Sequence, residues 1–256
     1  MTQKIKQLVI VIGGSDPSGG AGIQADLFTL QRLQVPARSV VTAVTAQKED
    51  RFLSYETVSV RNFEDQLKSV QKEAGSAVVK IGMLGDGRLF RPLVAWLERS
   101  KPAFVILDPV LKSSTGFPLL DREGIRRLPF LLSRVNLITP NLPEMEFLGA
   151  SSIGNQDRME EEAKKFLEIQ PPSSRLEAIL LKGGHLRGNP VDLLIAEGKT
   201  TFFAGKRVPG KGAHGTGCAL ASAIAGFLAR GKTLKEAVKE GRKVVLDKLR
   251  HARRVR

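Results

Sequence analysis

The sequence predicts an α/β fold in which a mainly parallel central sheet is covered by helices on both faces. Short apolar runs alternate with longer segments whose apolar residues recur at helical spacing, which is the pattern of repeated strand–helix units. The length of 256 residues suits one large domain, residues 1–256, and a hydrophobic content of 42% is enough for a substantial core.

The expected strands are short and rich in branched apolar residues, and they cover residues 8–12, 39–46, 77–83, 104–107, 135–138, 178–181, 191–196 and 200–204. The last two form a hairpin around Glu197-Gly198-Lys199. The expected helices cover residues 21–33, 63–74, 89–99, 160–169, 216–230 and 233–251. Ligands of such sheets bind beyond the carboxyl ends of the strands. The residues that directly follow strands are Gly13, Met83, Asp108, Asn141 and Lys182.

The chain is strongly basic, with 40 Lys and Arg against 26 acidic residues and a formal charge of +14. Such a balance suits anionic partners: nucleic acid, a membrane surface or phosphorylated metabolites. Only residues 243–256 are densely basic, and they lack the aromatic residues that stack on bases. We therefore interpret the charge as a solvated surface that also attracts anionic substrates, and we expect no nucleic-acid partner.

Cys218 is the single cysteine, which excludes an intrachain disulfide and a zinc site built from thiolates. The apolar run near the N-terminus is too short for a signal peptide, and no apolar stretch approaches the length of about 18 residues that indicates a membrane span. We expect a cytoplasmic protein without a membrane partner.

A glycine-rich turn at residues 212–219 leads into a small-residue segment of helical character. Gly215, Thr216 and Gly217 would place free amides at the helix N-terminus, where the peptide dipoles favour an anion. In a kinase, such a turn holds the γ-phosphoryl oxygens during transfer. Cys218 would lie in the first helical turn, a position that lowers the pKa of a thiol and favours thiolate. The alternative is a tightly packed buried helix with an inert cysteine.

A second glycine-rich loop, residues 13–26, lies between a strand and a helix. It contains five glycines but is neither a Walker A loop nor a clean dinucleotide fingerprint. Asp26, inside the expected helix, could accept a hydrogen bond from an amino or hydroxyl group of a ligand. The alternative is a carboxylate on the helix surface.

Charged residues at three other strand ends suit a metal and a nucleotide. Asp108 and Glu144 are candidates to hold Mg²⁺, directly or through water. Lys182, followed by Gly183-Gly184, suits a nucleotide phosphate. Each has an ordinary structural alternative: Asp-Pro turn chemistry, an acidic residue in the first turn of a helix, and a solvated lysine.

Together these segments resemble the hydroxymethylpyrimidine/phosphomethylpyrimidine kinases of thiamin biosynthesis, within the ribokinase-like superfamily. The resemblance runs collinearly from Ile10 to about Arg230, and GSDPSGGAGIQAD is its most specific element. The other matching segments are KIGML, LDPV, ITPNLPE, LKGGH and HGTGC. The resemblance implies a ribokinase-like three-layer sandwich, use of ATP and Mg²⁺, a small aminopyrimidine substrate and a homodimer.

The resemblance also implies roles for individual residues. It implies that the pyrimidine ring lies among Gly14, Asp26, Gln47, Met83 and Val110. It implies that the nucleotide phosphates and metal lie near Asp108, Glu144, Lys182 and Thr216. It implies that Gly215, Thr216 and Gly217 form the anion cradle and that Cys218 is the base, at the position where related sugar kinases carry an aspartate. A thiolate is adequate for a loose phosphoryl transfer.

The sequence departs from the family pattern at residues 48–52, which neighbour the substrate, at Lys112 and at Ser114-Thr115. The resemblance implies that Gln47 recognises the unphosphorylated pyrimidine, so we expect both phosphorylation steps, from the alcohol to the monophosphate and on to the diphosphate. Pyridoxine or pyridoxal kinase activity is the nearest alternative. A catalytically inactive, ligand-sensing relative is an alternative of another class, and the presence of all the catalytic residues argues against it.

Overall fold

The computed structural model describes residues 7–48, 51–186, 188–207 and 215–254. Within these ranges the strands form one sheet in the order β3-β2-β1-β4-β5-β6-β7-β8-β9. Their bounds are β1 Val9–Ser15, β2 Ala37–Gln47, β3 Phe52–Thr57, β4 Val78–Ile81, β5 Phe104–Leu107, β6 Leu137–Ile138, β7 Ala178–Leu181, β8 Val191–Ala196 and β9 Lys199–Ala204. The inner strands β2, β1, β4, β5, β6 and β7 run parallel, whereas β3, β8 and β9 pair antiparallel at the two edges.

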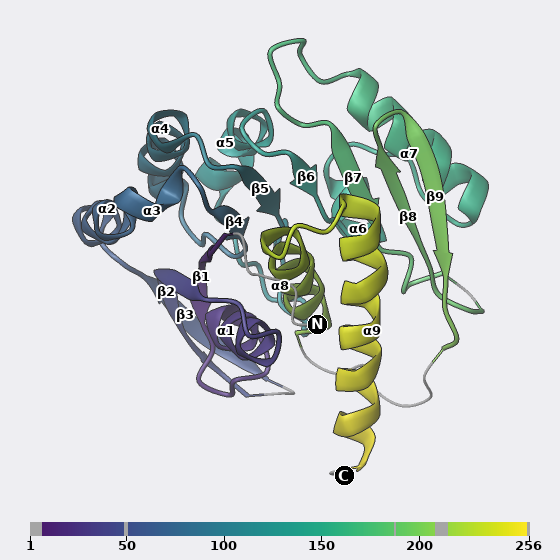
Figure 1. The fold of residues 1–256 in the computed structure, drawn as a ribbon, viewed down its shortest axis with the longest axis horizontal. Helices are drawn as coiled ribbons and strands as arrows, with labels where there is room; N and C mark the ends of the chain where they lie inside the picture. Colours follow the sequence, from purple (N-terminus) through teal and green to yellow (C-terminus); the bar gives the residue numbers. More distant parts are fainter. Residues whose placement is uncertain (1–6, 49–50, 187, 208–214, 255–256) are drawn as a thin grey trace.

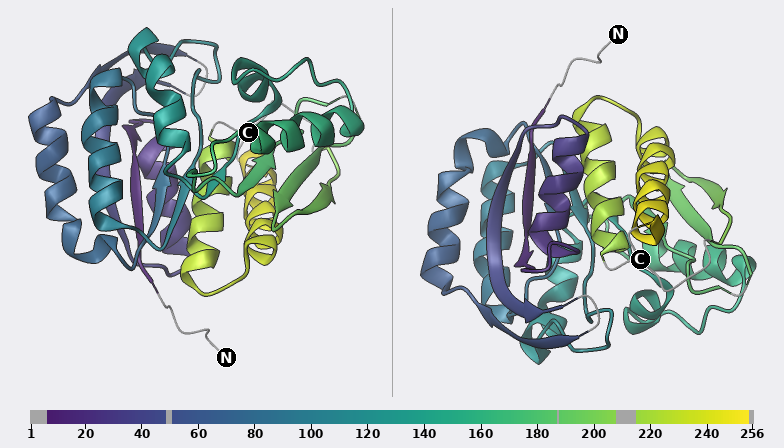
Figure 2. Two further views of the ribbon diagram at one scale, coloured as in Figure 1. Left: turned by 90° about the horizontal axis from the view of Figure 1, so that it is seen from above. Right: turned by 90° about the horizontal axis from the view of Figure 1, so that it is seen from below.

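Helices cover both faces of this sheet (Figures 1 and 2), as the sequence predicts for a three-layer α/β sandwich. Their bounds are α1 Gly22–Arg32, α2 Val60–Ser69, α3 Gln71–Ala74, η1 Gly87–Leu89, α4 Phe90–Ser100, α5 Arg122–Leu132, α6 Leu142–Phe147, α7 Gln156–Glu168, α8 Thr216–Ala229 and α9 Leu234–Arg254. One apolar core lies between the sheet and α2, α4, α5, α6 and α7, and a second lies between the sheet and α1, α8 and α9. The two faces of the sheet are therefore both buried, as parallel strands require.

The sequence-based prediction omitted β3, α5, the short helix α6 and the 3-10 helix η1, and it joined α2 and α3 into one helix. The edge strand β3 alternates half-buried and exposed positions, so its apolar signal is weak. Helix α5 contains Pro129, which reads locally as a helix breaker, but Asp121 caps its first turn by accepting a hydrogen bond from the Gly124 amide. The single helix expected at residues 63–74 is two helices, because the chain leaves helical geometry at Val70.

Two features of the sheet shape the edge at which its parallel strands end. The pairing of β1 with β2 shifts register between Gly13 and Gly14, a bulge that bends β1 where it meets the glycine-rich loop. A parallel bridge between Asn141 and Lys182 carries the pairing of β6 and β7 past the ends of both strands. Polar residues from four neighbouring strands consequently meet at one edge.

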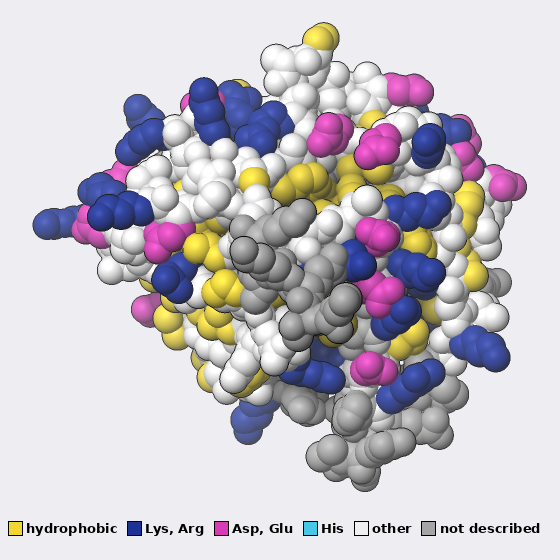
Figure 3. Space-filling model, in the orientation of Figure 1, with side chains coloured by type: hydrophobic (Ala, Val, Ile, Leu, Met, Phe, Trp, Pro, Cys, Tyr) yellow, Lys and Arg dark blue, Asp and Glu magenta, His cyan; other side chains and the backbone are white. Residues whose placement is uncertain are grey.

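The distribution of charge on the surface agrees with the interpretation that most basic side chains are simply exposed to solvent. On the face drawn in Figure 3, Lys and Arg side chains are scattered and interspersed with Asp and Glu. Among the described residues, no helix combines the length and apolar composition that crossing a bilayer requires.

Candidate active site

A cavity of about 160 Å³ lies at the carboxyl edge of the sheet. It brings together most of the site residues that the sequence predicts, from seven separate segments of the chain. They are Gly14, Asp26, Gln47, Met83, Asp108, Val110, Glu144, Lys182, Gly215, Gly217 and Cys218. Thr216 is not among the lining residues and is the first residue of α8. Gly212 and His214 of the same turn, and Glu49-Asp50 of the loop after β2, lie outside the described residues.

One end of the cavity is an apolar slot. Met83 and Leu119 pack together with Ala43, and Val110, Phe52 and Tyr55 pack against this group. The slot is narrow because a Cβ on Gly14 would lie 3.0 Å from the sulfur of Met83. Gln47, at the end of β2, pairs with Phe52 and lines the same end. A flat ring with polar edges suits this arrangement of apolar walls and one amide.

The other end is formed by the glycine turn before α8. Gly215 has φ +72°, and a Cβ there would lie 2.0 Å from the carbonyl oxygen of Gly20, so only glycine allows this close approach. A Cβ on Gly217 would lie 3.2 Å from Nζ of Lys182 and 3.7 Å from Oδ2 of Asp108. The free amides of the first turn of α8 therefore lie directly beside a charged pair, as a phosphoryl group requires.

The charged pair of Lys182 and Asp108 is largely buried and is held by direct hydrogen bonds. Nζ of Lys182 donates to Oδ1 of Asp108 at 2.8 Å, and Oγ1 of Thr139 donates to the same oxygen at 3.0 Å. Although burial favours the protonated acid, Lys182 and Lys80 outweigh it, and the pKa of Asp108 is lowered. The carboxylate of Asp108 is therefore ionised and has its second oxygen facing the glycine turn.

Glu144 serves the local fold and also lines the cavity. It forms a capping box with Asn141: the Asn141 amide donates to Oε2 of Glu144, and the Glu144 amide donates to Oδ1 of Asn141, both at 2.8 Å. Burial raises the pKa of Glu144 to about 7, with a further contribution from the negative charge of Asp108. Glu144 therefore caps the first turn of α6, as the structural alternative predicts, and it also lines the cavity.

The two carboxylates suit Mg²⁺. This ion is commonly bound by one or two carboxylates together with phosphate oxygens and water, and not by a complete protein cage. Asp108 and Glu144 line the same cavity, and each raises the energy of the other's charge. The described residues contain no group of three or more His, Cys, Asp or Glu that could hold an ion alone. A cation shared with a nucleotide fits this donor set.

The prediction that Cys218 is held as a thiolate is wrong for the ligand-free protein. The residue does lie in the first turn of α8, and Lys80 and the Gly22 amide both favour the anion. Burial outweighs these effects and raises the pKa of the thiol to about 11. The sequence indicated that Cys218 lies in the first turn of a helix, but it could not indicate how deeply the thiol is buried in the cavity.

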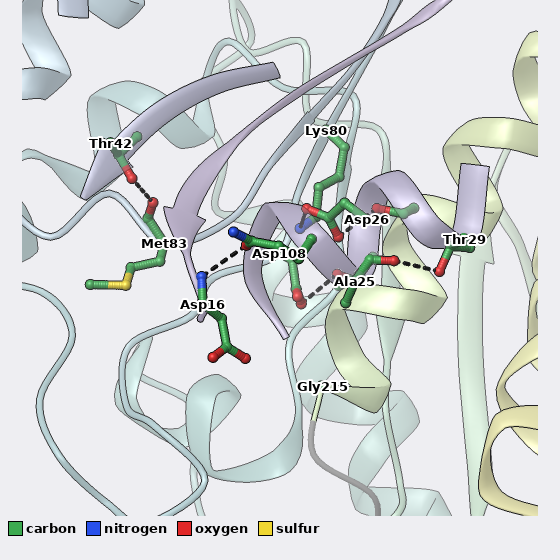
Figure 4. A network of polar contacts seen from close by, with 12 residues as sticks. Asp16, Ala25, Asp26, Thr29, Thr42, Lys80, Met83, Asp108 and Gly215 are labelled. Carbon is green, nitrogen blue, oxygen red and sulfur yellow. Dashed lines mark hydrogen bonds and ion pairs between the residues drawn. The ribbon is translucent and has the colours of Figure 1, made fainter. Parts of the chain in front are cut away.

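Asp26 is buried and hydrogen-bonded within the protein, and is not the surface carboxylate that the sequence left as an alternative. Both carboxylate oxygens already accept a hydrogen bond, Oδ2 from Nζ of Lys80 at 2.8 Å and Oδ1 from Oγ of Ser222 at 2.7 Å (Figure 4). The Asp26 and Lys80 side chains are each 1% exposed. The sequence analysis assigned no role to Lys80, although a lysine between Val79 and Ile81 of an apolar strand was a signal that it has a buried partner.

Comparison with known proteins identifies close relatives of the whole chain. Residues 16–256 match the model of the phosphomethylpyrimidine kinase family. The chain is 36% identical to the thiamine biosynthesis bifunctional protein of Geobacter sulfurreducens over 95% of its own length and spans about half (49%) of that protein. The crystal structure of the phosphomethylpyrimidine kinase of Clostridium difficile is 32% identical, with a TM-score of 0.81 over 94% of this chain and 99% of that one. The pyridoxal kinase of Staphylococcus aureus, solved with ADP, is 27% identical, with a TM-score of 0.83 over 95% and 87% of the two chains.

Proposed function

The chain belongs to the phosphomethylpyrimidine kinase family, and we propose that it transfers the γ-phosphoryl group of ATP to 4-amino-5-hydroxymethyl-2-methylpyrimidine and then to the resulting monophosphate. One observation carries this proposal above the others. A slot for a flat ring and an amide cradle for a phosphoryl group line the same cavity, with Cys218 lying at the cradle.

The ring would lie between Met83 and Val110, with the Gln47 amide and the Asp26 carboxylate facing its polar edge. This orientation points the hydroxymethyl group toward the first turn of α8. Positioning of this kind supplies much of the rate enhancement in phosphoryl transfer, since the loose transition state needs little covalent assistance.

In the transfer step, the hydroxymethyl oxygen forms a bond to the γ-phosphorus while the bond from that phosphorus to the β,γ-bridging oxygen breaks. The hydroxyl proton passes to Cys218 in its thiolate form, so the thiol must first lose its own proton to solvent in the complex with ATP, Mg²⁺ and substrate, because its pKa in the ligand-free protein is about 11. Amides of the Gly215 turn and the ammonium of Lys182 stabilise the charge on the equatorial oxygens. Mg²⁺, held by Asp108 and Glu144, would neutralise charge on the nucleotide phosphates.

The second phosphorylation needs a cation for the phosphate that the substrate already carries, and Lys248 is our candidate. Its Nζ donates to the carbonyl oxygen of Gly20 at 2.8 Å and lies 3.5 Å from that of Gly215. Burial lowers the pKa of this lysine, and the negative charges of Cys218, Asp26 and Asp16 would oppose that shift. The ammonium is thus held between the substrate loop and the anion cradle.

Phosphorylation of pyridoxine or pyridoxal is the second candidate. It is favoured by the likeness to the Staphylococcus aureus pyridoxal kinase, whose backbone agrees with this chain as well as that of the pyrimidine kinase does. A homodimer and a cytoplasmic location stay predictions from the resemblance and the sequence.

The test is a product assay with Mg-ATP that separates monophosphate from diphosphate, with the pyrimidine alcohol and pyridoxine as parallel substrates. Diphosphate from the pyrimidine is the expected result. Monophosphate alone would restrict the chain to the first step, and product only from pyridoxine would replace the proposal with the second candidate. Cys218→Ala should abolish most turnover and retain ATP binding, so near-normal turnover would make the thiol structural.

A further inference from the structure

Helices α1 and α8 lie side by side (Figure 2) and contact each other. The Gly22 amide lies near enough to the Cys218 thiol to oppose the rise in its pKa. One turn further along both helices, Oγ of Ser222 donates to Oδ1 of Asp26. One turn further again, a Cβ on Gly226 would lie 3.1 Å from Cδ2 of Leu30. Because each step is four residues on both helices, the helices run in the same direction and their registers are locked together.

The middle contact is the polar one, and it is tied to the sheet. Lys80 projects from β4 and bonds the second oxygen of Asp26, as Figure 4 shows. Ser222 is fully buried, and Lys80 and Asp26 are almost completely so. A strand, the helix of the substrate loop and the helix of the anion cradle are therefore joined at a single carboxylate. Buried polar groups of this kind are directional, so the contact at Asp26 adds a requirement of orientation to the apolar packing of α8 on α1.

Ser222 lies four residues after Cys218, so the two side chains share one face of α8. Fixing the hydroxyl of Ser222 fixes the height and rotation of the first turn, and with them the thiol and the cradle amides. A displacement of 1 Å at this turn would separate the proton acceptor from the hydroxyl that it serves.

We propose that Ser222 and Lys80 are positioning residues which, through Asp26, set the place of Cys218 relative to the bound substrate. This inference rests on the proposed function, and it adds a second role for Asp26 beyond contact with the ring. It also explains why an expensive buried ion pair stands at this point of the fold, where an apolar pair would pack equally well.

The test compares Ser222→Ala with Ser100→Ala. Ser100, at the end of α4, is also buried and accepts a hydrogen bond from Gln71 at 2.9 Å, so its removal deletes a similar contact away from the site. For Ser222→Ala we expect kcat to fall about 10- to 100-fold while the KM for the pyrimidine stays within about threefold. Ser100→Ala should leave both parameters near those of the wild type. A rise in KM with unchanged kcat would mean that Ser222 only orients Asp26 toward the ring, and would overturn the proposal.

A second measurement needs no catalysis. Cys218 is the chain's single cysteine, so the rate of its alkylation by iodoacetamide reports on that site alone. Ser222→Ala should raise this rate about threefold or more by loosening the turn that shields the thiol. Alkylation at the wild-type rate overturns the proposal. If the wild type shows no kinase activity, the proposed function fails while this measurement still decides the positioning role.

A conservative variant guards against misfolding. Ser222→Thr keeps the hydroxyl donor and should retain kcat within about threefold of the wild type and a wild-type alkylation rate. Loss of kcat as large as that of Ser222→Ala, in a variant that melts like the wild type, would show that the hydroxyl is not what matters.

Discussion

Replacing Lys80 with methionine should destabilise the protein by about 3–5 kcal/mol near neutral pH, because Asp26 would lose its cation and would have to carry an unpaired charge in the core or take up a proton at a pH above the pKa of the unfolded chain. Methionine is close to lysine in length, so the change removes the charge and leaves little empty space. Ser222 would remain as a partner of one Asp26 oxygen, and the other oxygen would lose its only charged donor.

The magnitude follows from burial. The Lys80 and Asp26 side chains are each 1% exposed, whereas an exposed pair such as Lys68 with Asp65, at 69% and 57%, contributes only about 0–1 kcal/mol. For a protein of this size, each kcal/mol lowers the melting temperature by about 2–4 °C, so the expected decrease is about 6–20 °C. Lys68→Met is the matched control and should melt within about 4 °C of the wild type.

The destabilisation should also depend on pH in a defined direction. Burial raises the pKa of Asp26 even with Lys80 present, and removal of the ammonium raises it further. A carboxyl group whose pKa is higher in the folded than in the unfolded chain binds its proton more readily when folded, so stability falls as pH rises between the two values. The deficit of Lys80→Met should therefore be full at about pH 8 and smaller at about pH 5.

Urea unfolding of the wild type and both lysine variants at these two pH values measures the effect. A deficit below about 1 kcal/mol at the higher pH would refute the reasoning, because it would mean that Asp26 is solvated or already neutral. The double variant Lys80→Met with Asp26→Leu should regain most of the stability, since no buried charge is left unpaired. It should not regain activity.

Three further outcomes concern other residues of the site. In the ligand-free protein, alkylation of Cys218 should accelerate about tenfold per pH unit between about pH 7 and 10, because a thiol with a pKa of about 11 is protonated throughout that range; a plateau near neutral pH would contradict this. Glu144→Gln, which keeps an oxygen for the Asn141 cap, should raise the Mg²⁺ concentration for half-maximal activity about tenfold, and unchanged dependence would remove Glu144 from the metal site. Lys248→Met should slow the second phosphorylation about tenfold more than the first, with Lys248→Arg intermediate, and equal slowing of both steps would exclude its role with the substrate phosphate.

The sequence could place most candidate site residues in one cavity because its signals there are local. A polar residue directly after an apolar strand lies at the carboxyl edge of a parallel sheet wherever that strand pairs, so Asp108 and Lys182 could be assigned to one edge without knowledge of the strand order. The glycine turn was recognisable for the same reason. Only the structure shows that Gly215 must touch the Gly20 carbonyl, which makes the glycine a steric requirement.

What the sequence could not predict depends on distant contacts. Lys80 and Asp26 are 54 positions apart, and Asp26 and Ser222 are 196 apart, so no local pattern indicates that they meet. The pKa of Cys218 was misjudged for the same reason. The helix N-terminus that favours thiolate is local, but the desolvation that defeats it comes from the whole cavity.

The two ends of the cavity also separate chemistry from specificity. The end proposed to hold the phosphoryl group is made of backbone amides and of Asp108 and Lys182, groups whose charges and hydrogen bonds suit a phosphoryl group whatever ring receives it. The ring end is made of side chains on β2, on β3 and on the loop after β5, where Phe52 stacks on Phe117 at 4.7 Å. A pyridoxal kinase and a pyrimidine kinase agree equally well with this backbone, so the backbone does not select the substrate. Selection must therefore lie in the slot, and Gln47 with its neighbours on β3 is where substitutions should change the accepted ring while leaving phosphoryl transfer intact.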